Sequence, residues 1–165
     1  MSKQMDYNTQ DIERLREAIK LSASFLSSPN HLDGGPFGAV IYQADTCIAK
    51  GWNHVLSAPD ATAHAEVTAI REACKNLQTF DLSGCVLYSS CEPCPMCLMA
   101  AKWANISRIF FAATREDAAA IGFRDDELYK LLKDGVYATP IEECSSEAAE
   151  VMSQWYSSYA STAYY

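Results

Sequence analysis

The sequence predicts an α/β fold, a three-layer α/β/α sandwich around a central mixed sheet of five strands. Strand-like segments alternate with helix-like segments after an opening hairpin, a pattern typical of a mixed sheet covered by helices on both faces. The chain has 165 residues, of which 49% are hydrophobic and 21% charged, as in an ordinary globular domain. No linker or internal repeat divides the chain, so we predict a single domain over residues 1–165.

The first half of the chain contains an amphipathic helix, a hairpin and a second helix. Apolar residues spaced by threes and fours predict a helix that begins near Thr9: Ile12, Leu15, Ile19, Ala23 and Leu26. Residues 37–43 and 47–52 are predicted strands joined by a tight turn. A loop at 53–62 then leads to a helix at 63–77.

The second half alternates strands with helices and ends in a helix. The predicted elements are a strand at 85–90, a helix at 95–104, a strand at 108–113, short helices around Asp117 and at 126–133, and an edge strand at 136–142. Gly135 is suited to end the second short helix. Ala148, Met152, Trp155 and Tyr159 recur at helical spacing and predict the last helix.

The end of the chain is rich in aromatic residues. Nothing after Glu150 is charged, and five aromatic side chains crowd the segment: Trp155, Tyr156, Tyr159, Tyr164 and Tyr165. Exposed aromatic surface is costly in water. For residues 155–159 two interpretations stay open, packing on the chain's own sheet and packing on a partner subunit.

Charge and composition exclude several classes of protein. The chain has 13 Lys and Arg against 21 Asp and Glu, a net charge of −8, which disfavours binding to a long nucleic acid. No apolar run reaches the roughly 18 residues of a membrane span, and the chain does not start with an apolar signal core. We therefore expect a soluble, cytoplasmic protein. The seven cysteines are an odd number, which disfavours a framework of disulfides.

The strongest local motif is Pro93-Cys94-Pro95-Met96-Cys97, at the start of a predicted helix. A proline in the first helical turn is tolerated because that N–H has no helical partner. The positive end of a helix lowers thiol pKa values and favours the thiolates that bind zinc. Two other interpretations compete with metal binding: a dithiol redox pair and two packed core cysteines.

His64 and Glu66 form a second motif at the start of the preceding helix. One imidazole together with Cys94 and Cys97 would give zinc three protein ligands and leave the fourth position open, as a catalytic zinc requires. Glu66 could then move a proton without binding the metal. Residues two apart on a helix differ in direction by roughly 200°, so this helix must present its N-terminal end to the site.

Cys91 lies three residues before Cys94 and is the alternative third thiolate. Its position at the end of a strand favours a packed thiol instead. A structural zinc module would use Cys91 as a fourth ligand and close the site, whereas a redox protein would hold no metal.

The two motifs resemble the zinc-dependent cytidine/deoxycytidylate deaminase superfamily, whose signature is His-x-Glu followed by Pro-Cys-x-x-Cys. The resemblance covers residues 33–137 and is closest to the small bacterial guanine deaminases. The matching stretches are residues 34–41, 62–71, 90–97 and 117–119. The resemblance implies a cytidine deaminase-like fold and Zn²⁺ as the cofactor.

The resemblance also implies roles for individual residues. It assigns His64, Cys94 and Cys97 as zinc ligands, Glu66 as the proton shuttle, Asp117 as an acid near the departing amine, and Asn53, Phe37, Trp103 and Tyr165 as substrate-binding residues. Members of the family are homodimers in which the C-terminal segment, here about residues 145–165, crosses to the partner. The aromatic chain end is consistent with this exchange.

The function that this resemblance implies is zinc-dependent hydrolysis of guanine to xanthine and ammonia, with a nucleobase as the small-molecule substrate. Asp117 is the main reason to favour guanine. The alternatives are cytosine, a nucleoside such as guanosine, a triazine related to guanine such as ammeline, and adenosine in transfer RNA. The net charge of −8 and the lack of a C-terminal Lys/Arg cluster disfavour transfer RNA.

Overall fold

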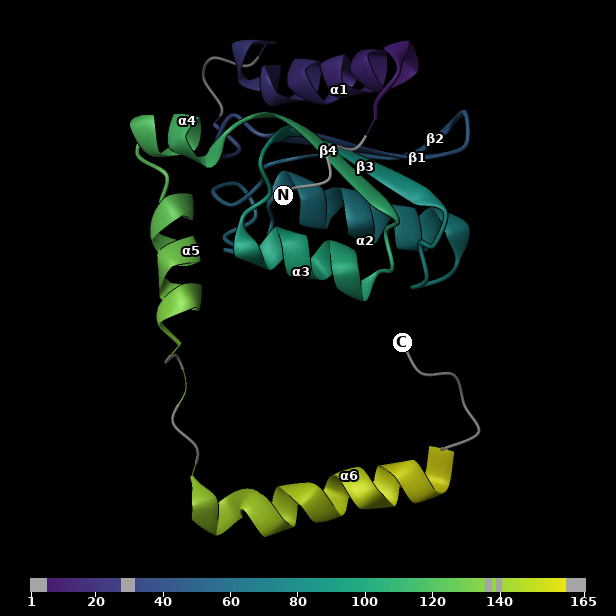
Figure 1. The fold of residues 1–165 in the computed structure, drawn as a ribbon, viewed down its shortest axis with the longest axis vertical. Helices are drawn as coiled ribbons and strands as arrows, with labels where there is room; N and C mark the ends of the chain where they lie inside the picture. Colours follow the sequence, from purple (N-terminus) through teal and green to yellow (C-terminus); the bar gives the residue numbers. More distant parts are fainter. Residues whose placement is uncertain (1–5, 28–31, 136–137, 139–140, 160–165) are drawn as a thin grey trace.

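The computed structural model describes residues 6–27, 32–135, 138 and 141–159, and shows a mixed sheet between layers of helices (Figure 1). The sheet order is β2-β1-β3-β4, with strands β1 (Gly38–Gln43), β2 (Thr46–Trp52), β3 (Cys85–Cys91) and β4 (Arg108–Ala113). Strand β1 is antiparallel to β2 and β3, whereas β3 and β4 are parallel. Helix α1 (Thr9–Ser22) covers one face, and α2 (Ala65–Leu77) and α3 (Pro95–Trp103) cover the other. The predicted three layers are confirmed.

Local sequence signals explain where the first elements begin and turn. Asn8 caps α1 in a reciprocal pair with Asp11, so the helix begins at Thr9 as predicted. The helix ends at Ser22, and a 3₁₀ turn, η1 (Ser24–Ser27), follows where the sequence predicted continued helix. The predicted hairpin is confirmed, because β1 turns into β2 through Ala44, whose φ of 49° is left-handed.

Two glycines bring helices into direct contact with the sheet. Gly51 lies against the backbone at the start of α2, where a Cβ would overlap the carbonyl oxygen of Ala65. Gly38 lies against α1 in the same way, where a Cβ would overlap the carbonyl oxygen of Ala18. These close approaches fix the first turn of α2 beside the end of β2.

The buried core divides into one layer on each face of the sheet. Ile41, Leu87 and Ile70 belong to the cluster beneath α2 and α3. Val40 and Tyr88 belong to the cluster beneath α1. Because side chains alternate along a strand, β1 and β3 supply both layers.

The sheet has four strands among the described residues, where the sequence predicted five. Much of the predicted fifth strand, at 136–142, lies outside the described residues. Ala138 and Ile141 belong to no strand, and Glu142 begins a 3₁₀ turn, η2 (Glu142–Cys144). Pro140 in this segment has no N–H to donate to a ladder, which weakens the strand prediction.

The regular elements described after β4 are all helices. The predicted short helices are α4 (Arg115–Ala120) and α5 (Asp125–Asp134), and Gly135 ends α5 with a left-handed φ of 84°. Helix α6 (Ser145–Tyr159) matches the predicted last helix, lies apart from the sheet in Figure 1, and has no buried residue. The described part of the chain contains no helix that is both long and apolar enough to span a membrane.

Candidate active site

Two helix N-termini meet at the site. His64 is the N-cap residue of α2 and Cys94 is the N-cap residue of α3, and neither side chain caps its own helix. Cys97 lies in the first turn of α3. The helices pack side by side beneath the sheet, so these three side chains converge (Figure 1). The expectation that α2 presents its N-terminal end is confirmed.

The three side chains form a compact set of metal-ligating groups. His64 Nδ1 lies 3.6 Å from Cys94 Sγ and 3.5 Å from Cys97 Sγ. All three ligand atoms lie within 4.8 Å of one another. Tetrahedral zinc bonds to one nitrogen and one sulfur would separate the two atoms by about 3.6 Å. The donor chemistry and the spacing therefore fit zinc, with three ligands from the protein.

The electrostatics of this group favour a thiolate. Hydrogen bonds from Cys97 and His64 lower the pKa of Cys94 to about 4. The same contact with Cys94 raises the pKa of His64. Two helix N-termini add partial positive charge beside the sulfur atoms.

Glu66 lies fully buried beside this group, in the first turn of α2. Its Oε1 accepts a hydrogen bond of 3.0 Å from the Ser89 hydroxyl of β3. Burial raises the pKa of Glu66 above the ordinary value for a glutamate. The carboxylate therefore holds a proton more readily than a solvated one.

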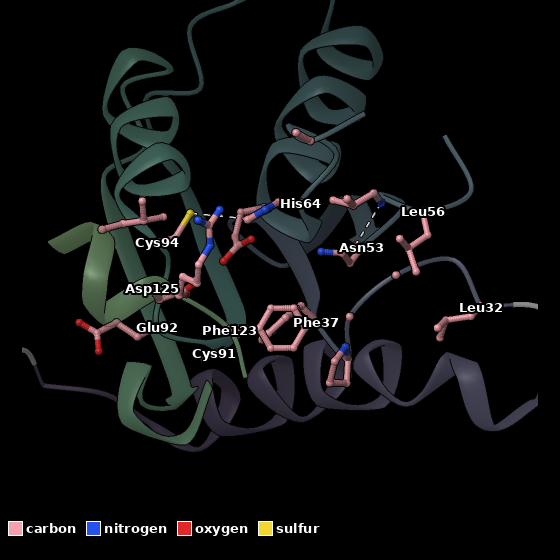
Figure 2. A pocket seen from close by; sticks show the side chains of 18 residues that line it. Leu32, Phe37, Asn53, Leu56, His64, Cys91, Glu92, Cys94, Phe123 and Asp125 are labelled. Carbon is pink, nitrogen blue, oxygen red and sulfur yellow. Dashed lines mark hydrogen bonds between the residues drawn. The ribbon is translucent and has the colours of Figure 1, made fainter. Parts of the chain in front are cut away.

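His64, Glu66 and Cys94 open into a pocket of about 680 Å³ (Figure 2). The predicted residues Asn53 and Phe37 also line it. Asn53 is buried, and its Oδ1 accepts a 3.1 Å hydrogen bond from the backbone N–H of Val55, which leaves its Nδ2 as a donor. A Cβ at Gly34 would overlap that same Oδ1, so Gly34 helps to fix the amide.

An aromatic pair also lines the pocket. The rings of Phe37 and Phe123 lie edge to face with centroids 4.7 Å apart. Both side chains line the pocket, together with Leu32, Leu56 and Leu128 at its apolar parts. The cavity therefore combines a flat apolar surface with a few polar groups, as small-molecule sites do.

The structure does not bring the other predicted residues into this pocket. Asp117 accepts hydrogen bonds from the N–H and the hydroxyl of Thr114 and so caps α4; it lines a separate hollow beside α1. Trp103 lies at the far end of α3 with 64% of its surface exposed. Tyr165 lies outside the described residues. The substrate-binding roles of Trp103 and Tyr165 stay predictions.

Asp125 is the acidic residue that the sequence analysis missed. It begins α5, lines the pocket, and lies close enough to Cys94 and His64 to interact with their charges. Burial raises the pKa of Asp125. The available signal was an acid directly after Gly122-Phe123-Arg124, which is also the ordinary pattern of a helix start.

Cys91 does not join the metal-ligating group. Its thiol donates to the carbonyl oxygen of Thr114 at 3.4 Å, and burial raises its pKa to about 11. The group of His64, Cys94 and Cys97 found in the described part of the chain does not include it. This placement favours the packed thiol over a fourth ligand.

Comparisons with known proteins agree with this geometry. The family model of the cytidine and deoxycytidylate deaminase zinc-binding region matches residues 9–113, more than half of the chain. A guanine deaminase of Bacillus subtilis (strain 168) is 57% identical over 97 residues, 59% of this chain and 62% of that protein. The chain thus spans less than two thirds of this curated relative. A tRNA-specific adenosine deaminase of Haemophilus influenzae is 39% identical over 122 residues, 68% of each protein.

A solved structure extends the likeness to the whole fold. The X-ray structure of guanine deaminase from Bacillus subtilis superposes with a TM-score of 0.79 at 39% identity, covering 96% of this chain and 99% of that chain. The matched region contains both zinc-binding motifs. The chain belongs to the cytidine and deoxycytidylate deaminase zinc-binding family.

Proposed function

We propose that this protein is a zinc-dependent hydrolase that deaminates guanine to xanthine and ammonia. The observation that carries the proposal is the joint opening of His64, Cys94 and buried Glu66 into one pocket lined by Asn53 and Asp125. A relative and a structural neighbour named guanine deaminase support the choice of guanine.

His64, Cys94 and Cys97 would hold the zinc ion. When bound, zinc supplies a Lewis acid that activates water near neutral pH. Three protein ligands would leave one position for solvent or substrate, and two of the three, His64 and Cys94, line the pocket.

Glu66 would carry the proton through the reaction. Its Oε1 accepts a hydrogen bond from Ser89, and burial raises its pKa, so the carboxylate takes up a proton more readily than a solvated one. It would take one proton from the attacking water and deliver it to a ring nitrogen of the base. It would then take the second proton from the resulting hydroxyl group on the carbon and deliver it to the departing amine, as the C–N bond breaks and the C=O bond forms.

Asn53, Phe37 and Asp125 would bind the base. The Asn53 Nδ2 offers a donor to an acceptor of the purine, since its Oδ1 is already engaged by Val55. Phe37 provides apolar surface for the ring. Asp125 would accept a hydrogen bond from the exocyclic amine of guanine, the role that the sequence analysis predicted for Asp117.

The second candidate function is deamination of adenosine in transfer RNA, which a relative of that name favours. The net charge of −8 opposes binding to a phosphate backbone.

An ammonia-release screen of the zinc-loaded protein would compare free bases, nucleosides, triazines and a transfer RNA anticodon stem-loop. Guanine is expected to give the highest kcat/KM, and a higher value for the RNA would overturn the proposal.

We also propose a homodimer in which residues 145–165 pack on the partner subunit and Tyr165 caps its pocket. Support comes from α6, whose large apolar side chains are exposed in a single chain: Val151, Met152, Trp155, Tyr156 and Tyr159. Light scattering is expected to give twice the chain mass for the full protein and a single chain mass after removal of residues 145–165. The same number of chains per particle for both proteins would contradict the exchange. The cytoplasmic location stays a prediction.

A further inference from the structure

Glu92 lies in the turn between β3 and α3, directly after Cys91 and two residues before Cys94. Both of its carboxylate oxygens contact Arg115. Oε2 accepts the backbone N–H of Arg115 at 3.2 Å, and Oε1 pairs with the guanidinium at 3.3 Å. The Glu92 side chain is only 18% exposed. The turn that supplies Cys94 is therefore tied to the first residue of α4.

The same arginine extends the contact to α5. Its guanidinium lies 4.3 Å from the centroid of the Tyr129 ring, within the range of a cation–π contact. The Tyr129 hydroxyl donates a 2.7 Å hydrogen bond to the carbonyl oxygen of Pro93. Glu92, Arg115 and Tyr129 thus link α4 and α5 to the residues directly before Cys94.

Tyr129 anchors the face of α5 that carries Asp125. The two residues are four apart, so their side chains lie one above the other on one side of the helix. No residue of α5 is buried, which leaves few packing contacts to fix the helix. The position of Asp125 in the pocket therefore depends strongly on the links made one turn further along.

We propose that Glu92, Arg115 and Tyr129 form a latch that positions Asp125 beside His64 and Cys94. The inference rests on the deamination proposed above for its kinetic consequence. The three latch residues are positioning residues, because they act through Asp125.

The first test combines Tyr129→Phe with Asp125→Ala in a double-mutant cycle on guanine. Tyr129→Phe keeps the ring under Arg115 and removes only the hydroxyl; it is expected to lower kcat/KM about tenfold, since misplaced groups react far more slowly. Asp125→Ala is expected to lower kcat/KM about 100-fold, and the double variant should fall no further. Equal losses from Tyr129→Phe with and without Asp125 would overturn the proposal.

Tyr42→Phe is the matched control. Its hydroxyl donates a hydrogen bond of the same 2.7 Å length, to Glu17 on the α1 side of the sheet. It is expected to lower stability without changing kcat/KM.

A second pair of variants, Arg115→Lys and Arg115→Met, separates the effect of the ion pair with Glu92 from a general loss of folding. Lysine should retain more activity than methionine, and the reverse order would overturn the latch.

Hydrogen exchange of residues 125–134, measured by mass spectrometry, tests the latch without any substrate. Exchange in α5 is expected to quicken in Tyr129→Phe and to stay unchanged in Tyr42→Phe. Unchanged exchange in Tyr129→Phe would overturn the latch even if guanine is the substrate. If the zinc-loaded wild-type protein releases no ammonia from guanine, the proposed function fails, while the exchange result still decides the latch.

Discussion

Strand β3 places Tyr88 and Ser89 on opposite faces of the sheet, and each of these neighbours contacts a buried acid. Tyr88 donates a 2.6 Å hydrogen bond to Asp11 of α1. Ser89 donates a 3.0 Å hydrogen bond to Glu66 of α2. Both acids are buried, and each accepts a hydrogen bond from a hydroxyl group of β3, but they differ in what surrounds them.

On the α1 side the charges are compensated. Arg14 lies 3.0 Å from Asp45, contacts the Tyr88 hydroxyl at 3.4 Å, and stacks 4.4 Å from the centroid of the Tyr42 ring. Burial alone would raise the pKa of Asp11, but the hydrogen bonds from Tyr88 and Asn8 and the nearby charges of two arginines together outweigh it, and the pKa is lowered.

On the α2 side burial prevails. The pKa of Glu66 is raised, and the carboxyl faces a cavity that also holds His64 and Cys94. The lowered pKa of Asp11 means that its ionised form stabilises the fold, whereas a buried acid with a raised pKa beside an open cavity is suited to move protons.

The largest effect is expected from Glu66→Gln, which keeps the size of the side chain and removes its acid. Loss of general acid–base catalysis should lower kcat by about 10³- to 10⁴-fold. Ammonia release would be measured together with zinc content and thermal unfolding, both expected at the wild-type level. Retained turnover in a zinc-replete sample would contradict the assignment of Glu66 as the group that moves protons.

Arg14→Met tests the other face. It removes the contacts of Arg14 with Asp45 and with the Tyr88 hydroxyl and should lower the free energy of unfolding by about 1–3 kcal/mol. Urea denaturation measures the loss, and kcat of the folded protein should not change. A loss of activity without a loss of stability would show that the α1 face takes part in catalysis.

Gly34→Ala sharpens the comparison inside the pocket. A methyl group at this position would displace the Asn53 amide, and KM for guanine should rise by roughly tenfold or more because a misplaced contact weakens binding of the base. Gly84→Ala is the matched control. A Cβ there meets nothing within 4 Å, and its positive φ costs stability alone. Equal KM values for the two variants would contradict the role of Asn53.

The smallest effect concerns pH. The pKa of Asp11 is lowered in the folded state. Its ionised form therefore adds stability at pH values above the pKa of the same aspartate in the unfolded chain, which is about 3.9. This contribution is lost as the pH falls through the folded pKa. The stability gap between wild type and Asp11→Asn, from urea titrations between neutral and acid pH, should therefore narrow below about pH 4. A gap that stays constant would mean that Asp11 is not ionised in the fold.

Local patterns identified the residues of the metal-ligating group, and the family resemblance assigned them as zinc ligands. His64 and Glu66, and Cys94 and Cys97, lie within a few residues of each other, and each pair starts a helix whose beginning the sequence marks. The hairpin and the capped start of α1 were predictable for the same reason. The four central strands follow from runs of apolar residues.

The position of Asp125 in the pocket, by contrast, could not be predicted from a local pattern, because it depends on tertiary structure. Asp125 reaches the site because the chain turns between α4 and α5, and no short pattern encodes that return. Thr114 and Asp117 did carry a readable signal, since a threonine followed three residues later by an acid is the capping pattern seen in the structure. For α6 the helical period was predictable, whereas its position apart from the sheet was not.

The glycines at positions 38 and 51 have a practical consequence for redesign. They belong to paired strands, and each allows a helix to contact the sheet backbone directly, so a larger residue at either position would push that helix away from the sheet. At Gly51 the displaced helix is α2, whose first turn follows His64. A library that seeks a new base preference should hold both glycines constant. Such a library should vary Leu32, Leu56 and Leu128, whose side chains line the cavity. Replacing them does not change the contacts between helices and sheet that the two glycines make.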